Sequence, residues 1–123
     1  MKLKQNDVIL FIGDSITDVG RNREDGYNLG SGYPLMVAGA LSARYPELQL
    51  QFLNRGIGGN KIGDLKERWE TDCLNLKPNV VSILIGINDT WHAIGQEKFA
   101  TADYLAFFEA TYRQLLEDVR NQL

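Results

Sequence analysis

One run of apolar residues restricts the possible folds more than any other part of the chain. Residues 8–12 are all apolar, and the run stops at Gly13, Asp14 and Ser15. Such a run is typical of a strand buried on both faces, as in a parallel sheet. A serine directly after such a strand lies at the carboxyl edge of the sheet, where open α/β proteins build their sites. The sequence therefore predicts an α/β fold with its chemistry at the end of the first strand.

Composition restricts the class of protein and its partners. A chain of 123 residues is long enough for one domain that buries roughly two-thirds of its unfolded surface. Its formal net charge of −3 gives no reason to expect nucleic acid or an anionic membrane as a partner, and no apolar segment could span a bilayer. The single cysteine, Cys73, cannot form an internal disulfide and fits a reducing, cytoplasmic location.

A loop, a helix and a second strand are predicted next along the chain. Residues 19–32 are rich in glycine, asparagine and charge, which indicates a long loop over the sheet edge. A helix is expected from Pro34, which suits a first helical turn, until Pro46. Apolar and polar residues then alternate over residues 48–52, as in a strand with one solvated face. We expect this strand at an edge of the sheet.

A glycine-rich segment, residues 54–63, has more backbone freedom than a plain turn requires. Asp64 and Glu67 have the spacing of a capping box, so a second helix is predicted to begin at Asp64 and to end before Pro78. Its inner stripe is expected to comprise Leu65, Trp69 and Cys73.

A third apolar run begins at Val80 and ends at Ile85, and it predicts a strand covered on both faces. A last helix is predicted from Thr101 almost to the end of the chain, because apolar residues recur there at helical spacing. The order of elements predicts three parallel strands joined by right-handed crossovers, with the first strand in the middle. No fourth strand follows to cover the third. We therefore expect an oligomer or a companion chain to pair with it.

Three polar clusters share one expected location, because each follows a strand at its carboxyl end. They are Gly13-Asp14-Ser15, Gly58-Gly59-Asn60 and Gly86-Ile87-Asn88-Asp89. Each also has a plain structural interpretation: a capped strand-to-helix turn, a tight glycine turn and an Asx-type turn. The glycine cluster does not match the dinucleotide fingerprint, since the third glycine of that spacing falls on Lys61. Their convergence is more informative than any one of them.

Together the clusters fit acyl transfer. Ser15 would be the nucleophile, and three N–H donors would face one developing oxyanion: its own backbone N–H, that of Gly59 and the side-chain amide of Asn88. Glycine lets the backbone approach the substrate closely, and asparagine supplies a neutral donor on a short stem.

The same segments resemble a known family. FIGDSITD, NRGIGGN and IGINDTW resemble the first three conserved blocks of the SGNH, or GDSL, hydrolases, in the right order and each after a strand. The fuller context LGSGYP, NRGIGGNKIGDLKERWETD and KPNVVSILIGINDTW is similar to the branch with acetylxylan and xylo-oligosaccharide acetyl esterases. The resemblance implies a flavodoxin-like three-layer α/β fold with about five parallel strands, of which this chain would hold three. It also implies Ser15 as nucleophile, with Gly59 and Asn88 in the oxyanion hole.

One part of the family pattern does not occur in these residues. The family takes its catalytic base and orienting acid from a later Asp-x-x-His block. A serine hydroxyl is a weak nucleophile without an adjacent base. We therefore expect residues 1–123 to be the N-terminal part of one hydrolase domain, inactive or incomplete alone. The only histidine, His92, is interpreted as a substitute base, a substrate contact or an ordinary loop residue.

Further substrate contacts are expected from residues that flank the catalytic candidates: Asp14, Asp89, Trp91 and His92. Trp91 suits a platform on which a sugar ring stacks, and equally an aromatic side chain that closes a loop.

Charged residues near the first two blocks suggest how the loops are held. Asp18 and Arg55 flank these blocks, and an ion pair between them would fix their relative positions. The charged residues Arg21, Arg23, Glu24 and Asp25 are expected to form a solvated loop, with lining of the acyl pocket or contacts in an oligomer as the alternatives. No cluster of histidine, cysteine and carboxylate has metal-ligand spacing, so we expect neither a metal nor a cofactor.

The sequence thus predicts a serine ester hydrolase, with small carbohydrate O-acetyl esters as the expected substrates. The alternative from another class is a catalytically silent binding or assembly module, because the base and its acid are missing. Nucleotide binding at the glycine cluster is a third hypothesis, for which we expect no saturable dinucleotide binding.

Overall fold

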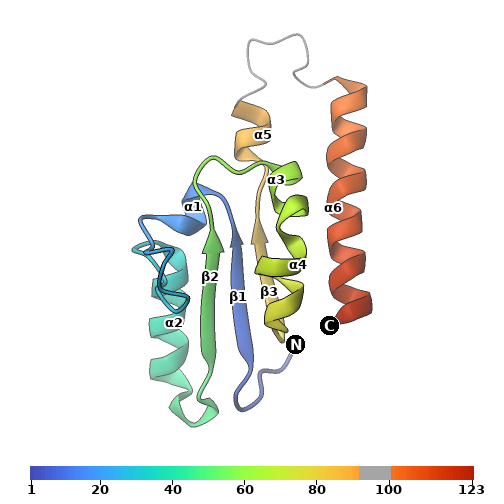
Figure 1. The fold of residues 1–123 in the computed structure, drawn as a ribbon. Helices are drawn as coiled ribbons and strands as arrows, with labels where there is room; N and C mark the ends of the chain where they lie inside the picture. Colours follow the sequence, from blue (N-terminus) through green and yellow to red (C-terminus); the bar gives the residue numbers. More distant parts are fainter. Residues whose placement is uncertain (92–100) are drawn as a thin grey trace.

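A parallel sheet forms the centre of the fold in the computed structural model, which describes residues 1–91 and 101–123 (Figure 1). Within these residues the sheet has three strands, β1 (Val8–Gly13), β2 (Gln51–Gly56) and β3 (Val80–Leu84), in the order β2-β1-β3. β1 pairs in parallel with both neighbours. The predicted topology, with the first strand in the middle and the second at an edge, is confirmed.

Helices connect the strands and cover the sheet. In chain order they are α1 (Ser15–Asp18), α2 (Tyr33–Arg44), α3 (Ile62–Glu67), α4 (Trp69–Asp72), α5 (Ile87–Trp91) and α6 (Ala102–Gln122). α6 packs against α3 and runs along one side of the sheet (Figure 1). Among the described helices, none combines the length and the apolar composition needed to cross a bilayer.

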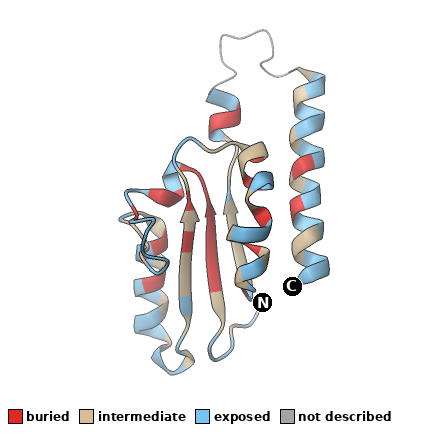
Figure 2. Cartoon of the chain, in the orientation of Figure 1, coloured by how far each residue is buried: buried red, intermediate tan, exposed pale blue. Residues whose placement is uncertain are grey.

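The central strand β1 is buried along almost its whole length, as its apolar run predicts (Figure 2). Leu10 and Ile12 belong to the main core cluster. Phe11 packs edge-to-face on Tyr33 of α2, with the ring centroids 5.7 Å apart. Because alternate side chains of a strand point to opposite faces, helices on both faces are needed to bury β1.

The main core joins the sheet to α3, α4 and α6. Its buried members are Leu10, Ile12, Ile62, Leu65, Trp69, Cys73 and Leu115. Three of them, Leu65, Trp69 and Cys73, form the predicted inner stripe of the second helical segment. Burial of a large apolar side chain of this kind stabilises the fold by roughly 1.5–3 kcal/mol.

The second strand begins later than the sequence pattern predicts. Pro46–Leu48 forms a 3₁₀ turn, η1, and Gln49 follows with a left-handed φ of 47°, which interrupts extended backbone. The strand expected over residues 48–52 was therefore wrong at both ends, because β2 runs from Gln51 to Gly56. As a result Asn54 lies in the strand rather than in the glycine-rich loop.

The second helix also differs from its prediction. It starts at Ile62, and Lys61 is its N-cap. The Lys61 N–H donates to Asp64 Oδ2 at 2.8 Å, so Asp64 closes a capping box from the third helical position instead of opening the helix. The helix breaks at Arg68, whose φ of −110° and ψ of 11° separate α3 from α4.

The strand β3 is less buried than its composition predicts (Figure 2). Its residues are mostly half-buried, and Leu84 is 43% exposed. In the described part of the chain, no strand pairs with the edge of β3 that faces away from β1. Within these residues β3 is therefore not buried on both faces as expected. That an oligomer or a companion chain pairs with it stays a prediction.

Candidate active site

The strands end at one level of the sheet, which places the loops after them side by side. The parallel register pairs Gly13 of β1 with Gly56 of β2 and with Leu84 of β3. A Cβ on Gly13 would overlap the carbonyl oxygen of Leu84, and one on Gly56 would overlap the backbone nitrogen of Asp18. Only glycine allows this close approach of backbones. The three polar clusters therefore meet at one edge of the sheet.

Ser15 is exposed at the first turn of α1, directly after β1. Asp14 is the N-cap of this helix, because its Oδ1 accepts a hydrogen bond from Ile16 N–H at 2.9 Å. Asp14 is 1% exposed, and its Oδ2 has no hydrogen-bond partner among the described residues. Among the described residues, none forms a hydrogen bond with the exposed Ser15 side chain.

The glycine cluster lies against Ser15. A Cβ placed on Gly58 would lie 3.8 Å from Ser15 Cβ. The next residue, Gly59, is exposed and has a φ of +83°, a backbone conformation that favours glycine. No described residue accepts a hydrogen bond from the Gly59 N–H. This donor is thus available beside the serine.

Asn88 connects the third cluster to the second. Its side chain is nearly buried, and Nδ2 donates to the Asn60 carbonyl oxygen at 3.1 Å. An asparagine amide has two N–H donors, so one remains for a substrate oxygen. The contact fixes the Asn88 amide next to the glycine that precedes Asn60.

Arg68 connects the ends of β1 and β2 with the glycine loop. Its guanidinium donates to the carbonyl oxygens of Gly13 (3.1 Å) and Arg55 (2.7 Å) and to Asn60 Oδ1 (2.9 Å). It also pairs with Asp72 at 3.0 Å. Burial lowers the pKa of the guanidinium below its ordinary value, against the opposing effect of Asp72.

Sequence reasoning missed this role of Arg68. The signal was present, because an arginine stands directly beside the inward-facing Trp69 on a helix with an apolar inner stripe. A charged residue at such a position is half buried and needs partners, and here they are backbone carbonyls.

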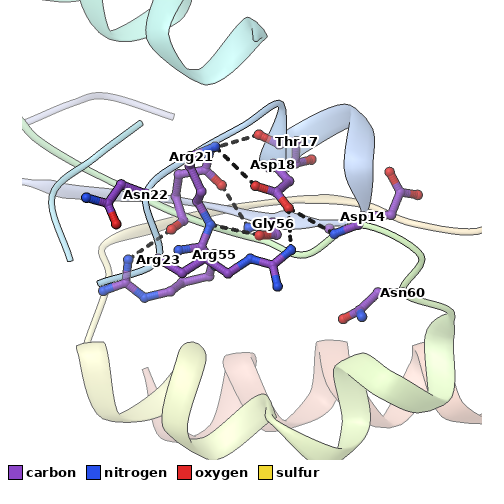
Figure 3. A network of polar contacts seen from close by, with 12 residues as sticks. Asp14, Thr17, Asp18, Arg21, Asn22, Arg23, Arg55, Gly56 and Asn60 are labelled. Atoms are coloured by element: carbon purple, nitrogen blue, oxygen red, sulfur yellow. Dashed lines mark hydrogen bonds and ion pairs between the residues drawn. The ribbon is translucent and has the colours of Figure 1, made fainter. Parts of the chain in front are cut away.

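Asp18 pairs with a different arginine from the one the sequence suggested (Figure 3). Its Oδ2 accepts from Arg23 Nη2 at 2.7 Å and from Gly58 N–H at 3.0 Å, and its Oδ1 accepts from Arg21 N–H at 3.3 Å. Arg55 instead donates to the carbonyl oxygen of Gly26. The expected Asp18–Arg55 ion pair is therefore wrong: the chain turns back after α1 and brings Arg23 to the carboxylate.

The side chain of Asp18 is 11% exposed. Burial acts to raise its pKa, but the hydrogen bonds from Arg23 and from the Gly58 N–H outweigh burial, and the pKa lies below its ordinary value. Asp18 is thus ionised at neutral pH.

The loop after α1 is less solvated than predicted. Arg21 is almost buried, and its Nε donates to the Gly56 carbonyl oxygen at 2.8 Å. Asn54 of β2, fully buried, donates from Nδ2 to the carbonyl oxygens of Thr17 and Leu29, at 2.7 and 2.9 Å. These contacts attach the loop to the end of β2, so the expectation of a solvated loop fails at Arg21.

The predicted substrate contacts lie in different environments. Asp89 is buried, and its carboxylate accepts from the Ile62 N–H and from the Tyr104 hydroxyl, which join α5 to α3 and α6. Burial, with help from Asp89, raises the pKa of Tyr104 to about 12. Trp91 is 69% exposed at the end of α5, and His92 lies outside the described residues.

Sequence similarity places the chain in a known family. A family model described as the GDSL-like lipase/acylhydrolase family matches residues 11–123. The chain belongs to this family.

Individual members of the GDSL-like family are similar over nearly the whole chain. An acetylxylan esterase from Geobacillus stearothermophilus is 46% identical over 128 aligned residues, which cover 98% of this chain and 57% of the relative. A crystal structure of an acetylxylan esterase from the same organism has 44% identity and a TM-score of 0.87, covering 100% of this chain and 58% of the other. A protein from Parabacteroides merdae described as a GDSL-like lipase has 44% identity and a TM-score of 0.89, covering 99% and 57%.

This GDSL-like chain thus spans a little over half the length of the relatives it matches. The similarity confirms the three-layer α/β fold that the resemblance implied. Within the described residues, the site combines a serine with N–H donors, and it holds no histidine. That donor set can stabilise an oxyanion, but it does not include a base to activate the serine.

Proposed function

We propose that the chain forms part of a serine ester hydrolase domain in which Ser15 is the nucleophile. The oxyanion hole comprises the backbone N–H groups of Ser15 and Gly59 and the side-chain amide of Asn88. One observation supports the proposal: Gly58 lies against Ser15, and Asn88 donates to the Asn60 carbonyl two residues later, so the loops after all three strands are in contact near the serine.

The reaction divides into two acyl-transfer steps. Ser15 Oγ attacks the ester carbonyl carbon, its proton passes to a base, and the alcohol leaves with that proton. Water then hydrolyses the acyl-serine, which releases the acid and restores Ser15. In both steps the oxyanion accepts hydrogen bonds from Gly59 and Asn88, and removal of one such donor costs about 3–4 kcal/mol of transition-state stabilisation.

The base is expected outside the described residues. Solved variants of the Geobacillus acetylxylan esterase include catalytic mutants in which a serine, an aspartate or a histidine is replaced by alanine. By analogy, a histidine and an aspartate beyond residues 1–123 would activate Ser15 in the whole protein. His92 is the alternative within the chain.

The proposed substrates are acetyl esters of small carbohydrates. This class rests on the acetylxylan esterase relatives together with one feature of the site. Trp91 is largely exposed at the end of the helix that carries Asn88, where an aromatic face suits stacking on a sugar ring. Asp14 and Asp89 are assigned a supporting role, because one caps α1 and the other holds α3 and α6.

The unpaired edge of β3 favours a second function, assembly with another strand. An apolar strand with a free edge is a template for pairing. We propose that a further segment of the protein or a second copy covers it. Sedimentation of the protein as its gene encodes it, with and without Leu84→Lys in this strand, distinguishes the two. If two copies pair through β3, the substitution should lower the sedimenting mass from dimer to monomer. If a further segment of the same chain covers β3, the mass should not change.

Hydrolysis of p-nitrophenyl acetate by the protein as its gene encodes it tests the proposed function. We expect Ser15→Ala to abolish the activity, and Ser42→Ala, an exposed serine on α2, to leave it unchanged. Activity that survives Ser15→Ala would exclude this nucleophile. No activity in the wild-type protein would favour the silent assembly module.

A further inference from the structure

We propose that Asp18 is a positioning residue that holds the glycine loop in place, so that the Gly59 N–H faces the oxyanion. The inference rests on the proposed function and deepens it. Asp18 does not touch the reacting atoms. It acts through the Gly58 peptide, whose N–H donates to Asp18 Oδ2 at 3.0 Å.

The contact lies close to the nucleophile. A Cβ on Gly58 would lie 3.8 Å from Asp18 Oδ2 and 3.8 Å from Ser15 Cβ, so Gly58 separates the carboxylate from the serine. Asp18 is the last residue of α1, and Ser15 is the first. The helix that presents the nucleophile therefore also presents the group that fixes the second cluster.

The glycine loop is held at both ends and free in the middle. On one side Asp18 binds the Gly58 N–H, and on the other side Asn60 is bound by Arg68 and Asn88. Gly59 lies between these two anchors with an unused N–H in the described part of the chain. The Gly58 N–H lies in the planar Ile57–Gly58 peptide, so its hydrogen bond fixes the chain up to the Gly58 Cα, and the contacts of Asn60 fix the chain after Gly59. The Gly59 N–H lies in the short segment between these two fixed points. A donor fixed in advance needs no reorganisation during the reaction.

The carboxylate has to be neutralised to serve in this place, since a bare negative charge near the oxyanion would oppose it. Arg23 meets this need with an ion pair at 2.7 Å. Its side chain is 52% exposed, so it neutralises Asp18 without being part of the core. Arg21 contributes its backbone N–H from the other side. Asp18 is therefore bound by three donors, and one of them is the oxyanion-hole loop.

The test compares Asp18→Asn with Asp25→Asn in the protein as its gene encodes it, using p-nitrophenyl acetate. Both changes remove one negative charge from the same region. The exposed Asp25 side chain accepts only the Tyr27 N–H, which an asparagine oxygen can still accept. Asp18 instead uses both carboxylate oxygens to accept from three donors, and the single oxygen of an asparagine cannot replace both. We expect Asp18→Asn to lower kcat by about ten- to a hundredfold with little change in KM, less than full loss of a donor. Asp25→Asn should leave both constants unchanged.

Binding of phenylboronic acid gives a second measurement, whose result should change only if Asp18 positions the oxyanion hole and not if it merely stabilises the fold. The acid forms a tetrahedral adduct with an active serine, and its affinity should fall with Asp18→Asn by the same factor as kcat/KM. A rise in KM alone, or unchanged affinity for the boronic acid, would overturn the inference. If Ser15→Ala keeps activity, the proposed function fails instead, whatever Asp18→Asn does.

Arg23→Gln decides the matter should Asp18→Asn not fold. This half-exposed residue can be replaced without a core defect, and the change leaves an unneutralised carboxylate beside the loop. We expect kcat to fall about three- to tenfold at unchanged KM. A kcat equal to that of the wild-type protein would contradict the role of Asp18.

Discussion

The two outer strands of the sheet differ in how their ends are held. Buried polar contacts surround the end of β2: Asn54 and Arg21 bind backbone carbonyls, and Arg68 binds the carbonyls of Gly13 and Arg55. The β3 side has an unpaired edge within the described residues and an exposed Leu84. The glycine loop after β2 is therefore fixed by contacts among the described residues, whereas β3 has fewer such contacts and is less buried there.

The largest effect on stability is expected from Arg68→Met, which removes the hydrogen bonds of Arg68 at the end of β2. The change removes the side-chain donor to the Arg55 carbonyl oxygen, one of two donors to the Gly13 carbonyl oxygen, and the partner of the Asp72 carboxylate. We expect the free energy of unfolding to fall by about 2–4 kcal/mol, somewhat less than for a fully buried ion pair, because the two side chains are 14% and 23% exposed. Urea denaturation measures it.

Arg113→Met is the matched control for that change. Arg113 lies exposed on α6 and pairs only with exposed Glu109. Its replacement should alter stability by no more than about 0.5 kcal/mol. Equal effects of the two substitutions would show that the polar contacts at β2 do not stabilise the edge.

Asn88→Ala tests the one donor that links the two sides, since Asn88 follows β3 but contacts the loop after β2. We expect kcat for p-nitrophenyl acetate to fall about a hundred- to a thousandfold, as for removal of one oxyanion-hole donor. The exposed Asn121→Ala should match the wild-type protein. A loss below threefold would remove Asn88 from the oxyanion hole.

Acid should weaken the contacts at the end of β2, because the Asp18 carboxylate becomes protonated. Its folded pKa lies below the ordinary value of 3.8, so its contribution to stability is present above about pH 4 and is lost as pH falls through the folded pKa. The stability difference between the wild-type protein and Asp18→Asn should thus shrink below about pH 4. Urea denaturation at several pH values measures this. A difference that grows on acidification would contradict the sign of the shift.

The smallest effect probes the packing under β3. Cys73 is fully buried in the main core, and burial raises its thiol pKa to about 12. We expect DTNB to react with it at least about a hundredfold more slowly than in denatured protein, because little thiolate forms. Reaction at the denatured rate would mean that the core beside β3 opens freely.

Local patterns in the sequence predicted most of the fold. The apolar run of β1 and the inner stripe of the second helix follow from the spacing of apolar residues along the chain, so the sequence alone predicts them. The start of β2 was wrong because Gln49 adopts a left-handed φ, which no period reveals. The break at Arg68 was missed because its cause is tertiary: the side chain binds carbonyls far away in the chain.

At the site, the position of each cluster directly after a strand was enough to predict that the three clusters share one edge of the sheet. Their anchors were not predictable in the same way. The pairing of Asp18 with Arg23 rather than Arg55 depends on the path of an irregular loop. The role of Asp89 depends on a contact with Tyr104, a residue of the last helix.

The most direct test of the central claim is a crystal structure of the protein, as its gene encodes it, with Ser15 carrying a tetrahedral phosphonate or boronate adduct. We predict that one adduct oxygen accepts hydrogen bonds from the Gly59 N–H and from Asn88 Nδ2, each at about 2.7–3.1 Å. An adduct on Ser15 whose oxygens contact neither donor, or an adduct on another residue, would contradict the assignment of this sheet edge as the catalytic centre.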